Sequence, residues 1–188
     1  KNWAPIAGDG ELTNKTLVIL GYGGIGSQVA KLGKAFGMRV TGIRRNPQDD
    51  EHADEVLGLD RFEELLPLTD YLVLALPDSP QTRDIINADI LEKLNTSAMI
   101  INVGRGTAIN EVDLVDALNN GKIAAAALDT TKIEPLDTNS SLWMAKNCFI
   151  SAHDSAHSLL SLGRAFELFF QNIKNIKNSD RVINLYSE

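Results

Sequence analysis

The chain has little cysteine and no long apolar segment. Cys148 is the only cysteine among 188 residues, so the sequence contains no pair that could form an internal disulfide. This cysteine usage is typical of a reducing compartment, and we expect a cytoplasmic protein. No apolar run approaches the roughly 18 residues of a membrane span, so we expect no membrane partner.

The sequence also lacks an excess of basic residues. Eighteen Lys and Arg stand against 25 Asp and Glu, which gives a net charge of -7. Nucleic acids and anionic membranes favour proteins with surplus positive charge, so we expect neither as a main partner. Hydrophobic residues make up 44% and charged residues 23%, as in globular proteins. The length fits one large domain, or one domain and part of another.

Apolar runs of strand length recur along the chain. They are nearly continuous in apolar residues, which is typical of parallel strands buried on both faces. We expect strands at 16–20, 38–43, 71–76, 98–103, 123–128 and 148–151.

Helical patterns lie between these runs. One apolar face is formed by Ile25, Val29, Leu32 and Phe36, which are spaced by four, three and four residues. Further helices are expected at 88–94 and at 111–121, the latter ending at Gly121. Alternating strands and helices predict the α/β class, as a Rossmann-type doubly wound parallel sheet with helices on both faces.

The segment 158–178 predicts a long helix of a different kind. Its wide apolar face is formed by Leu159, Leu162, Phe166, Phe169, Ile173 and Ile176. Only a candidate strand at 182–186 follows it. Such a face needs a cover, which is either the protein's own sheet or a second domain absent from this chain.

A glycine pattern follows the first expected strand and opens the first helix. Gly21, Gly23 and Gly26 fit G-x-G-x-x-G, and Gly24 and Ile25 complete the turn. In this context the glycines allow a tight turn, close approach of a pyrophosphate and close packing of helix on strand. The helix amino end would attract the phosphates. The alternative is a strand–turn–helix unit that binds nothing.

Arginines stand where a ribose-binding acid is expected. Arg44 follows Gly26 by 18 residues, at the end of the second strand, and Arg45 follows it. Both can bind a 2′-phosphate, whereas an acid there would repel it. Asp49, Asp50 and Glu51 come too late to replace that acid. The sequence therefore favours NADP, with NAD as the second choice, unless the two arginines are only solvated charges.

Four separated motifs resemble one family. They are LPDSPQT (76–82), INVGRGTAINEVDLVDAL (101–118), AAALDTTKIEPL (125–136) and ISAHDSAHS (150–158). In this order and spacing they resemble the D-isomer-specific 2-hydroxyacid dehydrogenases, which include glyoxylate and hydroxypyruvate reductases. The resemblance covers nearly all of residues 14–186. It implies an oxidoreductase that transfers a hydride between a nicotinamide cofactor and a small 2-keto or 2-hydroxy acid.

The resemblance assigns three catalytic roles that the chemistry of the side chains also supports. Arg105 would bind the substrate carboxylate and polarise the carbonyl through its planar guanidinium. His153 would exchange a proton with the substrate oxygen. Glu134 would hold the imidazole and favour its protonated form. Each residue alone has an ordinary structural explanation; their joint order indicates catalysis.

The family pattern also implies a set of residues that line the cofactor. Besides the glycine turn and the two arginines, these are Leu76, Pro77, Thr82, Val103, Gly104, Arg105, Asp129 and His153. Asp129 would bind the nicotinamide carboxamide. Thr130 and Thr131 replace a common Val-Phe pair and Ala152 a common proline, which leaves the substrate and the exact aim of His153 open.

No metal is expected, although His153 and His157 are spaced to share a helical face. Within the family pattern, 1–13 would be a crossover segment, 14–157 the dinucleotide-binding domain and 158–188 the returning helix and tail. About a hundred residues of a substrate domain would then be absent, and we expect the chain alone to be a poor catalyst. The resemblance also implies a homodimer. Two alternatives are a non-catalytic dinucleotide-sensing module like the co-repressors of this fold, and a purely structural module.

Overall fold

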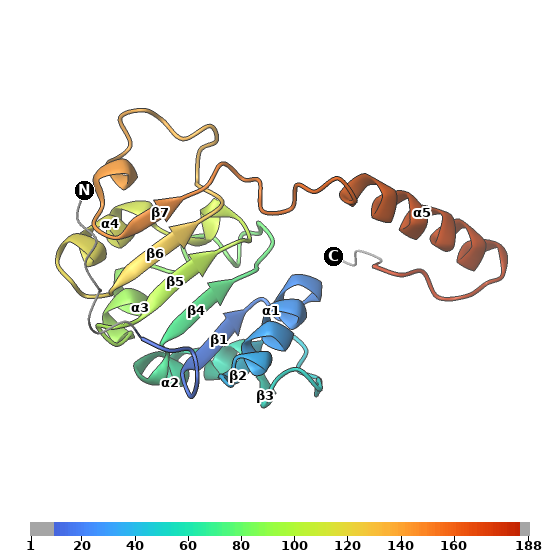
Figure 1. Ribbon diagram of the computed structural model, residues 1–188, viewed down its shortest axis with the longest axis horizontal. Helices are drawn as coiled ribbons and strands as arrows, with labels where there is room; N and C mark the ends of the chain where they lie inside the picture. Colours follow the sequence, from blue (N-terminus) through green and yellow to red (C-terminus); the bar gives the residue numbers. More distant parts are fainter. Residues whose placement is uncertain (1–9, 185–188) are drawn as a thin grey trace, which may run out of the picture. The chain divides into compact units, whose positions relative to one another are not determined.

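A computed structural model describes residues 10–184 (Figure 1). Its contacts divide the chain into two units, residues 1–152 and 153–188. In the described part of the chain, the first unit contains a seven-stranded sheet with its helices, and the second contains one long helix.

Seven parallel strands form the sheet of the first unit, in the order β3-β2-β1-β4-β5-β6-β7. They are β1 (Thr16–Leu20), β2 (Arg39–Ile43), β3 (Glu55–Leu57), β4 (Tyr71–Leu74), β5 (Met99–Asn102), β6 (Ala125–Leu128) and β7 (Cys148–Ile150). The predicted fold class and all six expected strands are confirmed. The edge strand β3 was not predicted, since three residues are too few to show a pattern.

Four α-helices lie between the strands: α1 (Gly24–Ala35), α2 (Phe62–Leu65), α3 (Ala88–Lys93) and α4 (Glu111–Asn119). Short 3₁₀ turns occur at 59–61, 66–68, 106–108 and 141–144. The side chain of Asn110 caps α4 by accepting hydrogen bonds from the amides of Val112 and Asp113. The helix ends just before Gly121, which has a φ of 68°, as predicted.

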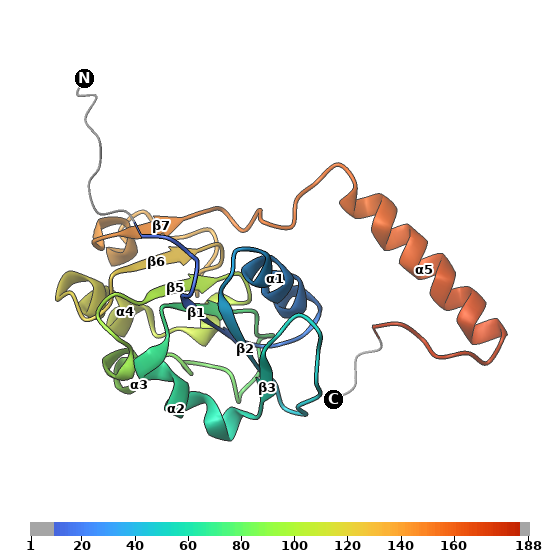
Figure 2. The same cartoon turned by 60° about the horizontal axis from the view of Figure 1, so that its bottom comes forward.

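The two faces of the sheet have separate cores. Alternate residues of a strand point to opposite faces. Val18 and Leu20 of β1 pack with α2, α3 and α4, in the larger cluster of buried residues. Leu17 and Ile19 pack with α1 in the smaller one. The sheet therefore lies between α1 on one side and the other three helices on the other (Figure 2).

Helix α1 forms where it was predicted, and Val29 packs against the smaller core, but the other three residues of the expected apolar face do not face the sheet. Ile25, Leu32 and Phe36 are 58%, 62% and 58% exposed. The buried residues of the helix are Gly26, Ala30 and Gly33. A β-carbon on Gly33 would lie 2.7 Å from the side chain of Leu17, so small residues let α1 pack directly on β1.

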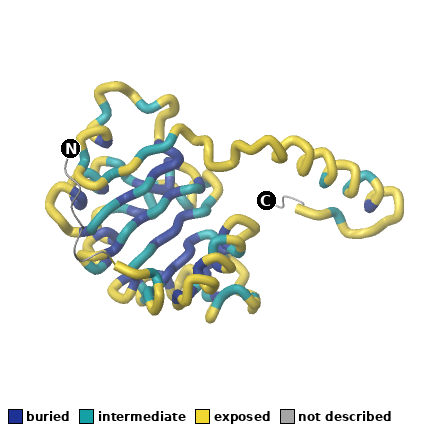
Figure 3. The backbone as a smooth tube through the Cα atoms, in the orientation of Figure 1, coloured by how far each residue is buried: buried dark blue, intermediate teal, exposed yellow. Residues whose placement is uncertain are grey.

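On the α1 side, β5 and β7 are only partly covered within the first unit. Met99 and Ile101 of β5 are half-buried, while their neighbours Ile100 and Asn102 are fully buried. Phe149 of β7 is 68% exposed. Figure 3 shows this alternation as buried and intermediate segments along the central strands.

The second unit contains α5 (Ser161–Lys177), which begins three residues later than the predicted segment. Its apolar residues Leu162, Phe166, Phe169 and Ile176 are more than half exposed. No strand occurs at 182–184, and the rest of that candidate strand lies outside the described residues, as does most of the expected crossover segment.

Candidate functional site

The candidate site lies at the carboxyl ends of the parallel strands of the first unit. The chain leaves β1 toward β2 on one side and returns through β4 on the other, so the strand order reverses between β1 and β4. In open parallel sheets a ligand crevice forms at such a reversal, outside the carboxyl ends. The glycine turn follows β1 at this point.

The glycine turn is held tightly against the residues that directly follow β4. Gly21 has a φ of 100°, and a β-carbon there would lie 2.6 Å from the carbonyl oxygen of Ala75. A β-carbon on Gly26 would lie 2.7 Å from the carbonyl oxygen of Gly21. Only glycine fits these two positions.

The middle of the turn is open. Nothing lies within 4 Å of where a β-carbon would stand on Gly23 or Gly24, and both glycines are exposed, as is Ile25. Gly23 is the N-cap of α1 and has no side chain to cap the helix. Exposed backbone at a helix amino end is the arrangement that binds a pyrophosphate. The residues therefore fit the phosphates of a dinucleotide.

Arg44 is joined to the same turn through the end of β2. The amides of Gly21 and Tyr22 both donate hydrogen bonds to the carbonyl oxygen of Ile43, at 3.0 and 2.9 Å. The amide of Arg44 donates to the carbonyl oxygen of Leu57 in β3. Arg44 is half-buried and Arg45 is exposed, and the pair directly follows the residue whose carbonyl binds the glycine turn.

The loop after β4 closes on itself and packs on the turn that carries Arg105. The hydroxyl of Thr82 donates to the carbonyl oxygen of Pro77 at 2.7 Å. A β-carbon on Gly104 would lie 2.7 Å from both the nitrogen and the oxygen of Leu76. Val103 is half-buried, and its amide donates a hydrogen bond to the carbonyl oxygen of Leu74 in β4. These predicted cofactor-lining residues thus meet at two adjacent strand ends.

Asn102 shapes the turn after β5. Its side chain is fully buried and accepts a hydrogen bond from the amide of Gly104 at 3.0 Å. It also donates to the carbonyl oxygen of Arg105 at 3.1 Å. Arg105 itself is exposed, and its guanidinium donates to the carbonyl oxygen of Gly104. The exposed guanidinium of Arg105 therefore carries its positive charge on a turn whose backbone is held by the side chain of Asn102.

An acid lies near this cation. Asp78 accepts hydrogen bonds from Arg83 and Thr107. The hydrogen bond from Arg83, then that from Thr107, holds the pKa of Asp78 below its usual value, and the charge of Arg105 contributes in the same direction.

The turn with Arg105 lies against the segment with Glu134. A β-carbon on Gly106 would overlap the peptide between Thr131 and Lys132. The amide of Thr131 donates to Oε1 of Glu134 at 3.0 Å. The structure therefore brings Arg105 and Glu134 onto adjoining segments, although 29 positions separate them in the sequence.

Asp129 follows β6 and is buried. Its Oδ1 accepts a hydrogen bond from the hydroxyl of Ser151 at 2.6 Å, and its amide donates to the carbonyl oxygen of Asn102. The next residue, Thr130, is 2% exposed, and its hydroxyl has no hydrogen-bond partner among the described residues. A buried hydroxyl without a partner is uncommon in proteins.

His153 is the first residue of the second unit, three residues after the end of β7. It is exposed and has a φ of 52°, in the left-handed region that is uncommon for residues other than glycine. Of the three predicted catalytic residues, the structure therefore places Arg105 and Glu134 in one unit and His153 in the other.

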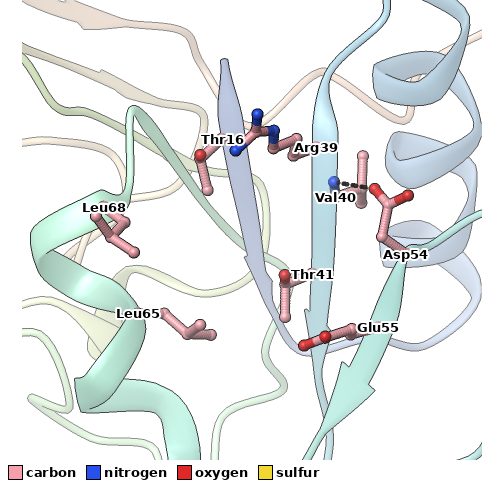
Figure 4. Close-up of a pocket in the computed structure, with 8 residues that line it drawn as sticks. All are labelled: Thr16, Arg39, Val40, Thr41, Asp54, Glu55, Leu65 and Leu68. Atoms are coloured by element: carbon pink, nitrogen blue, oxygen red, sulfur yellow. Dashed lines mark hydrogen bonds between the residues drawn. The ribbon is translucent and has the colours of Figure 1, made fainter. Parts of the chain in front are cut away.

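A hollow of about 440 Å³ lies at the other end of the strands (Figure 4). It is lined by the first residues of β1 and β2, Thr16 and Arg39, and by Leu65 and Leu68 across from them. None of the predicted site residues lines it.

Among residues 10–184, no group of three or more His, Cys, Asp and Glu side chains is arranged to hold a metal ion. No helix in the same range has the length and apolar character that crossing a bilayer requires.

Sequence patterns missed several residues that shape the site. Asn102, Tyr22 and Asp50 have buried or loop-closing contacts that no spacing rule indicates. Asn102 lies within the INVGRG motif, and an amide at the end of a buried strand is the one signal that could have singled it out.

Comparison with known proteins identifies the family. Residues 1–155 match the family described as D-isomer specific 2-hydroxyacid dehydrogenase, NAD binding domain. The chain belongs to this family.

Named relatives and a solved structure agree with this assignment. The chain is 37% identical over 166 residues to a hydroxypyruvate reductase of Blautia hydrogenotrophica, covering 87% of this chain and 51% of that protein. It is 39% identical over 155 residues to the glyoxylate reductase/hydroxypyruvate reductase of Homo sapiens, covering 81% and 47%. The structure of an NADPH-dependent glyoxylate/hydroxypyruvate reductase of Sinorhizobium meliloti, in complex with NADP and sulfate, matches with a TM-score of 0.87. Its sequence identity is 28%, and the match covers 98% of this chain and 59% of that one. The chain thus spans about half the length of the curated relatives it matches.

Proposed function

We propose that this chain is the dinucleotide-binding part of an NADP-preferring D-2-hydroxyacid dehydrogenase that reduces a small 2-keto acid. The observation that supports NADP is the position of Arg44. Its backbone is tied to β3, and the carbonyl before it accepts two hydrogen bonds from the glycine turn. A guanidinium so placed can neutralise a 2′-phosphate, whereas NAD would leave it without that partner.

The glycine turn, the loop at 76–82 and the turn at 103–105 would hold the dinucleotide, with Asp129 at the nicotinamide carboxamide. Bound NADPH supplies the hydride for the keto carbon. Arg105 would bind the substrate carboxylate and polarise the carbonyl, since it is an exposed cation on a backbone that Asn102 fixes. His153 would give the substrate oxygen its proton, and Glu134, oriented by the amide of Thr131, would hold the imidazole.

Glyoxylate and hydroxypyruvate are the proposed substrates. Relatives with these substrates in their names match over most of this chain, which favours a dehydrogenase over a non-catalytic dinucleotide sensor. Thr130 and Thr131 follow Asp129 directly, so they lie where a pocket wall would affect the choice of acid.

The proposal includes a homodimer in the cytoplasm. Three large apolar side chains of α1 and its C-cap, those of Ile25, Leu32 and Phe36, are exposed in a single unit, and a second copy would cover such a surface. The domain limits proposed are 14–157 for the dinucleotide-binding domain, with 1–13 as the crossover and 158–188 as the returning helix and tail. Light scattering of the purified chain tests the dimer, with a mass of one chain, 20.5 kDa, as the contrary result.

The direct test of the proposal is binding of NADPH and NADH to the chain, measured by calorimetric titration. We expect tighter binding of NADPH, and Arg44→Asp should weaken NADPH binding by about ten- to a hundredfold, because it removes a charge-assisted contact. Arg39→Asp is the matched control, since it makes the same change of charge at the opposite end of β2. Equal affinities in the unaltered chain would overturn the choice of NADP, and binding of neither cofactor would overturn the proposed site.

A further inference from the structure

The aromatic ring of Tyr22 is built into the base of the proposed cofactor site. Tyr22 stands inside the glycine turn, yet its side chain is only 3% exposed. A β-carbon on Gly42 would overlap the ring, so the tyrosine packs over β2 where glycine leaves space. The ring thus extends from the glycine turn toward the loop that follows β2.

The hydroxyl of Tyr22 reaches that loop. It donates a hydrogen bond to Oδ1 of Asp50 at 3.0 Å, and the same oxygen accepts from the amide of His52 at 2.9 Å. Burial and, after it, the hydrogen bond to Asp50 raise the pKa of Tyr22 to about 12. The hydroxyl therefore remains a donor throughout the physiological range.

The loop of residues 44–50 is consequently tied to the glycine turn at both ends. At its start, the carbonyl oxygen of Ile43 accepts hydrogen bonds from the amides of Gly21 and Tyr22. At its end, Asp50 accepts a hydrogen bond from the hydroxyl of Tyr22. Residues 45–49 between these two attachments are exposed.

Arg44 lies within electrostatic range of both partners of this hydrogen bond. Its charge acts to lower the pKa of Tyr22 and that of Asp50, against the larger burial effect in Tyr22 and alongside the hydrogen bond from His52 in Asp50. The charge of Arg44 and the carboxylate of Asp50 therefore attract one another. An unrestrained carboxylate could pair with the arginine and compete with a phosphate for it.

We propose that the hydrogen bond from Tyr22 to Asp50 determines cofactor specificity by holding the loop 44–50 so that Arg44 and Arg45 meet a 2′-phosphate. Tyr22 and Asp50 are positioning residues that act through the arginines. This inference rests on the proposed function, because it concerns the NADP site of the same dinucleotide-binding domain. NADH has no phosphate at the ribose 2′ position, so its binding has no 2′-phosphate contact with the arginines to lose.

Tyr22→Phe is the first test, since it keeps the ring against Gly42 and removes only the hydroxyl. The dissociation constants of NADPH and NADH are measured by calorimetric titration for the full 188-residue chain. We expect the preference for NADPH to fall by about three- to tenfold, the size of one lost hydrogen bond to a charged group, while NADH affinity changes by less than about twofold. If Tyr22 had a purely structural role, the variant would bind both cofactors more weakly by the same factor, and the ratio of the two dissociation constants would stay unchanged.

Asp50→Asn and Asp50→Ala form a second, matched pair. Both remove the negative charge, but only the asparagine retains an oxygen that can accept from Tyr22 and His52. We expect Asp50→Asn to keep the NADPH preference and Asp50→Ala to have a preference about three- to tenfold lower than Asp50→Asn. This pair also gives the answer if Tyr22→Phe reduces the yield of folded protein.

The outcomes separate this inference from the proposed function. A chain that prefers NADPH, together with unchanged ratios in Tyr22→Phe and between the two Asp50 variants, overturns the inference and leaves the proposed function intact. A chain without NADPH preference overturns the cofactor assignment and the inference together. If both Asp50 variants gain preference equally and Tyr22→Phe has no effect, Asp50 acts through its charge alone and the inference is wrong.

Discussion

Gly106 lies directly against the peptide between Thr131 and Lys132, with no room for a side chain between the two backbones. This contact joins the turn that carries Arg105 to the segment whose Thr131 amide binds Glu134. Two of the three proposed catalytic residues are therefore positioned by one close approach of backbone to backbone.

Gly106→Ala should separate these segments. We expect a loss of about 1–3 kcal/mol in the free energy of unfolding, as for overpacking in a well-packed site. Urea denaturation monitored by circular dichroism measures it. Gly24→Ala is the control, because nothing lies within 4 Å of its added methyl group and alanine favours the helix. Equal stability of the two variants would show that the two segments at Gly106 can move apart at little cost in the free energy of unfolding.

Asn102→Ala should destabilise the turn after β5. It removes a fully buried side chain and leaves the amide of Gly104 without its acceptor, so we expect a loss of about 2–4 kcal/mol. Asn120→Ala is the matched control, since Asn120 is exposed and its side-chain amide donates to its helix neighbour Asp116. Chemical denaturation compares them; similar small losses in both would contradict a central role for Asn102.

Tyr22 should give stability an alkaline limit. Its pKa is raised to about 12 in the folded state, whereas the ordinary value is 10.0. The unfolded chain therefore loses this proton first as the pH rises, and stability present below pH 10 is lost between about pH 10 and 12. The loss should be on the order of 2 kcal/mol. Unfolding free energies of the chain and of Tyr22→Phe, measured across this range, should converge; a constant difference would argue against the shift.

Thr130→Val should stabilise the protein. The Thr130 hydroxyl is buried and has no hydrogen-bond partner among the described residues, so replacing it with a methyl group should add about 0.5–1 kcal/mol. Thr69→Val is the matched control. Thr69 is equally buried, but its hydroxyl donates to the carbonyl oxygen of Leu65 at 2.8 Å, so this variant should lose about 1 kcal/mol. Thermal melts of the two variants should shift in opposite directions, and a lower melting temperature for Thr130→Val would contradict the argument.

Much of the fold could be predicted because its signals are local. A buried parallel strand is a short run of apolar residues, and six such runs became six of the seven strands. The end of α4 was predictable since Gly121 can adopt the φ of 68° that stops a helix. The glycine turn was recognisable because its spacing, between a strand and a helix, is itself a steric requirement.

Other features depend on contacts between distant residues. Helical spacing indicated that Ile25, Leu32 and Phe36 share a face, but not that this face is exposed. Instead, α1 packs on the sheet through Gly26, Ala30 and Gly33, because small residues let helix and strand approach closely. Periodicity defines a face, and only the partner surface decides whether that face is buried.

By itself, the sequence determined the parallel sheet, the glycine turn and the identity of the candidate residues, since each follows from local sterics or from the chemistry of a side chain. Only the tertiary structure decided how these residues are held: Tyr22 over Gly42 with its hydroxyl on Asp50, Asn102 within the turn of Arg105, and Gly106 against Thr131. Each of these contacts joins segments whose separation in space is set by the packing of the whole sheet, and no spacing rule along the chain encodes that distance.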